Sequence, residues 1–136
     1  MLLSRKGILA VAAVIDVALN AREKPVSAKA LANRHGLPPR HLEPVLQALV
    51  HDGILRGVRG PRGGYELGRD QQRIAAVDIL RAAGTVDEDS DAKTPATGLI
   101  GDVVLPAMAQ AEKTFAAALG EISLDQLVRR ARSRAS

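Results

Sequence analysis

The sequence contains no cysteine and no tryptophan, and only Tyr65 and Phe115 among its 136 residues are aromatic. Without cysteine the chain can form no disulfide bond, no thiolate zinc site and no cysteine nucleophile, which agrees with a cytoplasmic protein. Because aromatic rings are so scarce, alanine, leucine, valine and isoleucine have to pack the core, and this composition suits closely packed helices. A chain of this length is expected to form one domain, or a small domain with an appendage.

Long apolar runs are also missing, because no segment approaches the ~20 apolar residues that a membrane span requires. Residues 1–21 have a basic start and an apolar stretch, as a secretory signal peptide does. Asp16 interrupts that stretch, however, and its apolar residues recur at helical spacing. We therefore favour a retained first helix over about residues 5–21, in a protein that does not enter a membrane.

Positive charge is concentrated in the first half of the chain. Residues 1–73 hold twelve basic and six acidic side chains, whereas residues 74–136 hold seven basic and nine acidic side chains. The first half is therefore the candidate binder of a polyanion, and the second half is expected to serve another purpose.

The segment after the first helix has the pattern of a helix-turn-helix. Ser27 can cap a second helix, and Gly36 stands where a left-handed residue ends one. A third helix is expected to begin near Pro39 and to end at Gly53. Its inward face is expected to hold Leu42, Val45, Leu46 and Leu49.

A β-hairpin is expected directly after this pair of helices. Residues 54–58 and 64–68 are short strand candidates, and residues 59–63 form the turn between them. A fourth helix is expected over residues 73–84. Its inward face is expected to hold Ile74, Val77, Leu80 and Ala83.

After residue 84, the sequence predicts a loop, then a long helix and then a short helix. Residues 85–98 are acidic and poor in apolar side chains, so we expect a linker. A long helix is expected over about residues 99–119, kinked at Pro106, and Ser123 caps the last helix. Apolar residues at spacings of three and four fit a helix-to-helix seam, either between two copies or within one chain: Met108, Ala111, Phe115, Ala118 and Ile122.

The sequence RGPRGG, which begins at Arg59, combines arginine with glycine. A P-loop needs a lysine followed by serine or threonine, and a dinucleotide loop needs G-x-G-x-x-G, but neither pattern is present. A hairpin tip beside a nucleic-acid duplex needs small residues for close approach and cations for the phosphates or the minor groove. Gly60, Gly63 and Gly64 meet the first need, and Arg59 and Arg62 meet the second.

The outward face of the third helix carries side chains that can read base edges in a major groove. Pro44 lacks an amide hydrogen within the first turns, so this helix either starts late or bends. The three histidines do not have zinc-ligand spacing, and no catalytic pattern is present, so we expect no metal site and no enzyme. The candidate recognition residues are Arg40, His41, Glu43, Gln47 and His51.

Four stretches together resemble the iron–sulfur-cluster regulator family of bacterial winged-helix transcription factors. They read SRKGILAV, KPVSAKALANRHGLPPRHLEPVLQALVHDGIL, VRGPRGGYELGRD and AAVDILRAAG, and the most specific pieces are RGPRGGY and HLE. The resemblance implies a mainly α-helical fold with a small β-hairpin, in which a winged helix-turn-helix is joined to a long C-terminal dimerisation helix. It also implies a homodimer that binds an inverted repeat in double-stranded DNA.

The resemblance assigns roles to individual residues. It places Arg59, Gly60 and Pro61 in the wing at the minor groove, and Arg40 and Glu43 at recognition positions. Pro44 departs from the polar residue that is common at its position in the family. The resemblance also places the start of the first helix at the phosphate backbone, through Ser4, Arg5 and Lys6.

Cluster-sensing members of that family hold iron and sulfide with three cysteines in the loop that corresponds to residues 85–98. This chain has no cysteine, so it resembles the cluster-free branch and is expected to need no cofactor. The carboxylates of this loop (Asp87, Glu88, Asp89 and Asp91) would suit magnesium or calcium, but we favour a solvated acidic loop.

These observations predict a homodimeric, DNA-binding transcription regulator, which we expect to act as a repressor. The expected units are a winged helix over residues 1–84, a linker over 85–98 and a dimerisation segment over 99–136. A small-molecule effector between the dimer helix and the winged helix is compatible with this organisation. The alternative is a protein–protein adaptor that uses the same fold without binding DNA.

Overall fold

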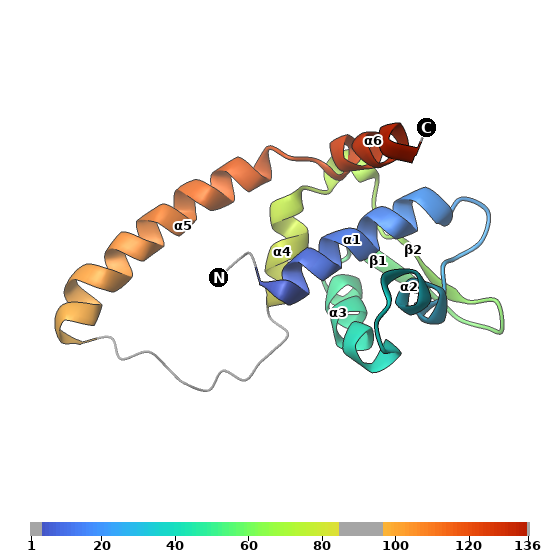
Figure 1. The fold of residues 1–136 in the computed structure, drawn as a ribbon, viewed down its shortest axis with the longest axis horizontal. Helices are drawn as coiled ribbons and strands as arrows, with labels where there is room; N and C mark the ends of the chain where they lie inside the picture. Colours follow the sequence, from blue (N-terminus) through green and yellow to red (C-terminus); the bar gives the residue numbers. More distant parts are fainter. Residues whose placement is uncertain (1–3, 85–96, 136) are drawn as a thin grey trace.

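The structure is a computed structural model that describes residues 4–84 and 97–135 (Figure 1). It confirms a mainly α-helical fold with one small hairpin. No helix in these two ranges is long and apolar enough to cross a membrane. The helices and strands are α1 (Arg5–Asn20), α2 (Ala28–His35), α3 (Pro39–His51), β1 (Leu55–Val58), β2 (Gly64–Leu67), η1 (Gln71–Arg73), α4 (Ala76–Gly84), η2 (Ile100–Val104), α5 (Leu105–Gly120) and α6 (Leu124–Ala135).

The expected helix boundaries around the helix-turn-helix are confirmed. Ser27 Oγ accepts a hydrogen bond from Ala30 N at 3.0 Å, and Gly36 ends α2 in the left-handed region at φ 63°. α3 begins at Pro39, and Pro44 lies inside it, so the alternative in which this helix starts late is wrong. The carbonyl that Pro44 leaves without an intrahelical partner belongs to Arg40, which is exposed, so water can satisfy it.

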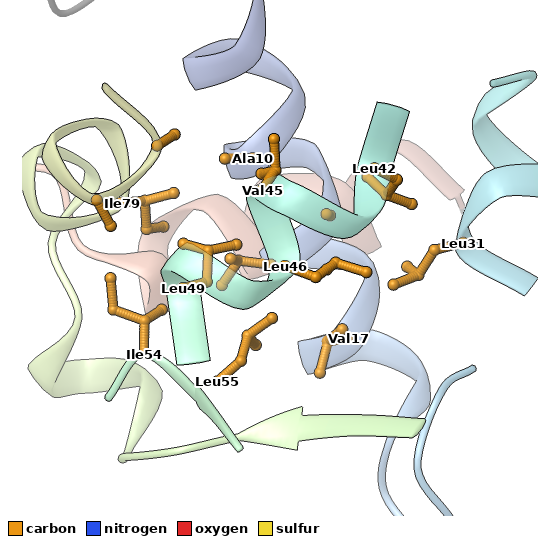
Figure 2. Close-up of a cluster of buried hydrophobic side chains, with 14 of the residues drawn as sticks. Ala10, Val17, Leu31, Leu42, Val45, Leu46, Leu49, Ile54, Leu55 and Ile79 are labelled. Atoms are coloured by element: carbon orange, nitrogen blue, oxygen red, sulfur yellow. The ribbon is translucent and has the colours of Figure 1, made fainter. Parts of the chain in front are cut away.

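The core is built around the inward face of α3 (Figure 2). The predicted inward residues Leu42, Val45, Leu46 and Leu49 are all fully buried. α1 contributes small and branched residues such as Ala10 and Val17 to the same cluster, and α4 contributes Ile79. Figure 2 also shows Leu31, Ile54 and Leu55 around α3.

The final helix, α6, also belongs to this core. Leu124 and Val128 are fully buried in the same cluster as the side chains of α1 and α3. Ser123 caps α6 as expected, because its Oγ accepts a hydrogen bond from Gln126 N at 3.2 Å. Gln126 Oε1 accepts from Ser123 N at 3.1 Å in return, which completes a capping box.

A short extended bridge joins the start of α4 to the start of α6. Ala76 N donates to Ile122 O at 2.8 Å, and Leu124 N donates to Ile74 O at 2.7 Å. Ile74 therefore lies in extended backbone before the helix, although it is buried as predicted. α4 begins at Ala76 rather than at residue 73.

The hairpin forms where the sequence predicts it, and a third segment pairs with it. β1 and β2 are antiparallel, with Leu55 opposite Leu67 and Val58 opposite Gly64. Val26 N donates to Tyr65 O at 2.9 Å, and Tyr65 N donates to Val26 O at 2.8 Å. The connection between α1 and α2 therefore adds a one-residue bridge on the other side of β2, which the sequence analysis did not foresee.

The long helix expected over residues 99–119 is present as η2 followed by α5. η2 is a π-helical turn, and it places the irregularity directly before Pro106 rather than at it. Figure 1 shows α5 extending away from the winged helix, with its C-terminal end near α6. Most of the predicted acidic linker, residues 85–96, lies outside the described residues.

We predict that Gly64→Ala lowers the free energy of unfolding by about 1–3 kcal/mol, because a Cβ there would overlap the backbone of Val26. Gly57→Ala is the matched control, since Gly57 lies in β1 with nothing within 4 Å of an added Cβ. Urea unfolding of both variants measures the difference. Equal stability of the two variants would mean that the close contact between β2 and Val26 does not restrict residue 64.

Candidate nucleic-acid interface

The outward face of α3 is exposed because the opposite face is fully buried. The predicted recognition residues Arg40, His41, Glu43 and Gln47 all lie on this exposed face. In the part of the chain that the structure describes, none of these four side chains forms a hydrogen bond or a salt bridge. Their polar groups are therefore available to a ligand that lies along α3.

The predicted wing residues form the tip of the hairpin. Arg59, Gly60, Pro61 and Arg62 are exposed, and Gly60 adopts a φ of 112° that favours glycine. Gly63 N closes the turn by donating to Gly60 O at 2.9 Å. Neither arginine is paired with another residue in the described ranges, so both charges face solvent.

Gly63 and Gly64 serve the hairpin itself rather than the approach of a ligand. A Cβ on Gly63 would overlap the carbonyl oxygen of Val58, and one on Gly64 would overlap that of Val26. Among Gly60, Gly63 and Gly64, only Gly60 has open space around an added Cβ. The sequence suggested all three glycines for close approach to a duplex, but Gly60 alone among them is not needed for the packing of the hairpin.

One cleft brings the recognition helix and the wing together. It has a volume of about 480 Å³ and is lined by Gln47 of α3, by Arg59 of the wing and by Tyr65 of β2. Tyr65 is half-buried against the core, and burial raises its pKa. The negative charge of Glu43 raises the pKa of Tyr65 further, so this tyrosine keeps its proton and can donate a hydrogen bond.

A second cleft, of about 780 Å³, lies between the wing and the start of α2. The cations Lys24 and Arg62 line it together with the α2 cap residue Ser27 and with Arg34, whose charge is paired with that of Asp16. Cations beside the positive end of a helix attract phosphate groups. Lys24 was not among the residues predicted from the sequence, although its place three residues before the helix cap Ser27 is a signal that could have revealed it.

The predicted phosphate contacts lie at the other end of α1. Ser4 caps this helix by accepting a hydrogen bond from Gly7 N at 2.9 Å, and Arg5 and Lys6 are exposed beside it. α1 has 16 residues, so about 24 Å separates these residues from the cleft at the start of α2. The structure therefore does not bring them together with the wing.

The predicted seam lies on an exposed face of α5. Met108 is 59% exposed and Phe115 38% exposed, and Ala111 and Ala118 are also exposed. Ile122 lies beyond the end of α5 and is half-buried. Further exposed apolar residues had not been assigned to this seam, and one of them, Val104, stands four residues before Met108. They are Ile8, Leu99, Val103 and Val104.

A buried carboxylate fixes the first helix of the helix-turn-helix against α1. Asp16 is only 7% exposed and accepts hydrogen bonds from Arg34 Nη2 at 2.7 Å and Arg34 Nε at 2.8 Å. Asn20 Nδ2 donates to Asp16 Oδ1 at 3.0 Å, and His35 Nε2 lies 3.1 Å from Oδ2. In the sequence, Asp16 is visible only as an interruption of an apolar run, so this role was not predicted.

The pKa of Asp16 lies below its usual value although burial raises it. Hydrogen bonds from Arg34 and Asn20 outweigh the effect of burial, and the charge of Arg34 adds to them. The carboxylate is therefore ionised at neutral pH and holds the guanidinium in place.

The chain does not fit an iron–sulfur cluster, because it has no thiolate to hold one. Within the described ranges, no group of three or more histidine, aspartate or glutamate side chains could hold a metal ion. The acidic residues 87–91 lie outside these ranges.

Comparison with protein families gives one match that covers most of the chain. The family named Rrf2, described as an iron-dependent transcriptional regulator, matches residues 3–130. The HTH-type transcriptional regulator IscR of Xenorhabdus nematophila is 42% identical over 92 residues, which are 68% of this chain and 54% of that protein. IscR of Cronobacter sakazakii is 41% identical over 92 residues, which are 68% of this chain and 55% of that protein. The chain spans about half the length of these curated relatives.

Solved structures show the same architecture. IscR of T. potens has a TM-score of 0.72 at 30% identity, and the match covers 95% of this chain and 87% of that one. CymR, the global cysteine regulator of B. subtilis, has a TM-score of 0.69 at 27% identity, and the match covers 94% of this chain and 96% of that one.

We predict that Asp16→Asn lowers the free energy of unfolding at neutral pH by about 1–3 kcal/mol, because the Arg34 guanidinium loses its charged partner. Because folding lowers the pKa of Asp16, its stabilising effect is present above the usual carboxyl pKa and is lost as pH falls through the lowered value.

Urea unfolding at neutral pH and in acid measures both effects. The gap between the wild type and Asp16→Asn should narrow in acid. Asp52→Asn, the same change at an exposed carboxylate, should leave stability unchanged. A gap that stays constant with pH would contradict the role of the Asp16 charge.

Proposed function

Since the chain belongs to the Rrf2 family of transcriptional regulators, we propose that it is a homodimeric repressor that binds an inverted repeat in DNA without an iron–sulfur cluster. The observation that carries this proposal is the cleft between α3 and the wing, which is lined by both Gln47 and Arg59. Winged-helix regulators read DNA with one helix in the major groove and with the hairpin beside it.

In this proposal, α3 lies in the major groove with its exposed face toward the bases. Arg40 is suited to guanine, Gln47 to adenine and Glu43 to the amino group of cytosine. His41 lies at the N-terminal end of the same face. The burial of the opposite side of α3 supports this arrangement, because it leaves these polar residues, and also His51, facing outward.

The wing supplies the cationic contacts. Arg59 would enter the narrow minor groove, where the negative potential is strongest, and Gly60 and Pro61 would let the backbone approach. Arg62 and Lys24 line the same cleft and would neutralise phosphates of one strand. Ser4, Arg5 and Lys6 would contact the backbone at a separate point, at the start of α1.

Dimerisation would occur through α5. Its 3–4 spaced apolar face is exposed, whereas its other side, which includes Lys113, faces Arg81 of α4 across a small cleft. A second copy of the chain, packed against Met108 and Phe115, would remove this apolar surface from water. Two winged helices held in this way would bind half-sites about one helical turn apart, or a small multiple of that distance.

The test of the whole proposal is selection of bound sequences from a random duplex pool with the full chain. The expected result is an inverted repeat, and sites of this sequence near the chain's own gene would identify the operator. Recovery of no enriched sequence, together with no retention on heparin at low salt, would favour the adaptor alternative.

We predict that Arg59→Ala weakens operator binding by about 1–3 kcal/mol, because one cation leaves the interface. The slope of log binding constant against log salt concentration should become less steep by about one. Titration by fluorescence anisotropy at several salt concentrations measures both quantities. Arg129→Ala is the matched control, since it removes the same charge from the exposed surface of α6. Equal affinities for the two variants would remove the wing from the DNA interface.

We predict that Phe115→Asp converts the dimer to a monomer at micromolar concentration, because it buries a charge in the apolar seam. Ala117→Asp places the same charge on a different face of α5 and should leave the dimer intact. Sedimentation equilibrium measures the mass of each variant. A wild-type chain that sediments as a monomer would refute the proposed dimer.

A further inference from the structure

A third cleft lies on α1, α6 and the end of α2, and no proposed DNA-contacting residue lines it. It has a volume of about 720 Å³, within the usual range for small-molecule sites. α1 and α6 each contribute a stripe of residues at spacings i, i+3, i+4 and i+7, so two helix faces form its walls. The stripes are Ala12, Ile15, Asp16 and Leu19 on α1, and Leu127, Arg130, Ala131 and Arg134 on α6.

The walls of this cleft are apolar, and its charges are mainly positive. Arg34 lines it, but its charge is balanced by its salt bridge to Asp16. Arg130 and Arg134 form no salt bridge or hydrogen bond within the described ranges. The neighbouring Arg129, by contrast, pairs with Asp125 at 2.9 Å. The cleft therefore carries two arginine charges that no carboxylate balances.

We propose that this cleft binds a small organic carboxylate. The apolar body of the ligand would lie between Ile15 and Leu19 of α1 and Leu127 of α6, where it would leave water. Its carboxylate would pair with Arg130 and Arg134, which stand one helical turn apart on α6. A neutral or cationic molecule of the same length would gain the apolar contacts without the charge pairing.

The position of the cleft gives such a ligand a route to the helix-turn-helix. Arg34 and His35 are the last two residues of α2, and both line the cleft opposite α6. Arg34 also lines the cleft beside the wing. A ligand held by Arg130 and Arg134 would lie in the cleft that Arg34 and His35 also line, so its binding would be coupled to α2 and would change the operator affinity. This consequence rests on the proposed DNA-binding function, whereas binding of the carboxylate does not.

The experiment is calorimetric titration of the full chain, without DNA, with octanoate, octan-1-ol and octylamine. We expect one saturable octanoate site per chain and at least tenfold weaker binding of the alcohol and the amine. Arg130→Ala/Arg134→Ala should lower octanoate affinity at least tenfold. Arg129→Ala/Arg132→Ala removes the same charge from α6 outside the cleft and should leave the affinity unchanged.

Two further variants keep the result interpretable. Arg130→Lys/Arg134→Lys should recover most of the octanoate affinity if the loss reflects charge rather than damage to α6. Ala117→Asp should keep full octanoate affinity, because that face of α5 belongs neither to the proposed site nor to the proposed seam. Absence of saturable octanoate binding would overturn the proposal. So would equal affinity in the two double-alanine variants, or loss of binding in Ala117→Asp.

Discussion

Burial of one face of α3 is the constraint on which the rest of the interface depends. Leu42, Leu46 and Leu49 are fully buried against neighbouring helices, and each contributes about 1.5–3 kcal/mol by leaving water. Rotating α3 about its axis would expose these side chains, so the helix has one stable orientation. That orientation alone decides that Glu43 and Gln47 face outward. The specificity of the surface therefore follows from the packing beneath it.

Two local contacts hold the parts beside α3 in place. The backbone of Gly64 lies directly on that of Val26, so the wing is fixed to the segment that leads into α2. The buried carboxylate of Asp16 holds Arg34, so α2 is fixed to α1. Arg34 borders both the cleft beside the wing and the cleft beside α6. The Arg34 side chain is therefore shared by the cationic cleft beside the wing and the cleft between α1 and α6.

The sequence predicted those features that depend on neighbours along the chain. Helix caps at Ser27 and Gly36, the apolar face of α3 and the hairpin turn each have a local signal, and the structure confirms them. The sequence did not predict the pairing of Val26 with β2. Nor did it predict the salt bridge between Asp16 and Arg34, which are 18 positions apart. A contact between two residues far apart in the sequence produces no repeating pattern, so the sequence alone does not reveal it. For the same reason, the burial of α6 beside α1 became visible only in three dimensions.

The long helix α5 shows how the fold and the proposed dimer depend on each other. None of its residues is buried, and an isolated helix of 16 residues is only marginally stable in water. Its C-terminal end is nevertheless held near α4, because Ile122 pairs with Ala76 just beyond it. A partner on the exposed face would therefore stabilise α5 in a direction already set by the core. Folding of this helix and association of two chains would then be one coupled equilibrium, whose position depends on protein concentration.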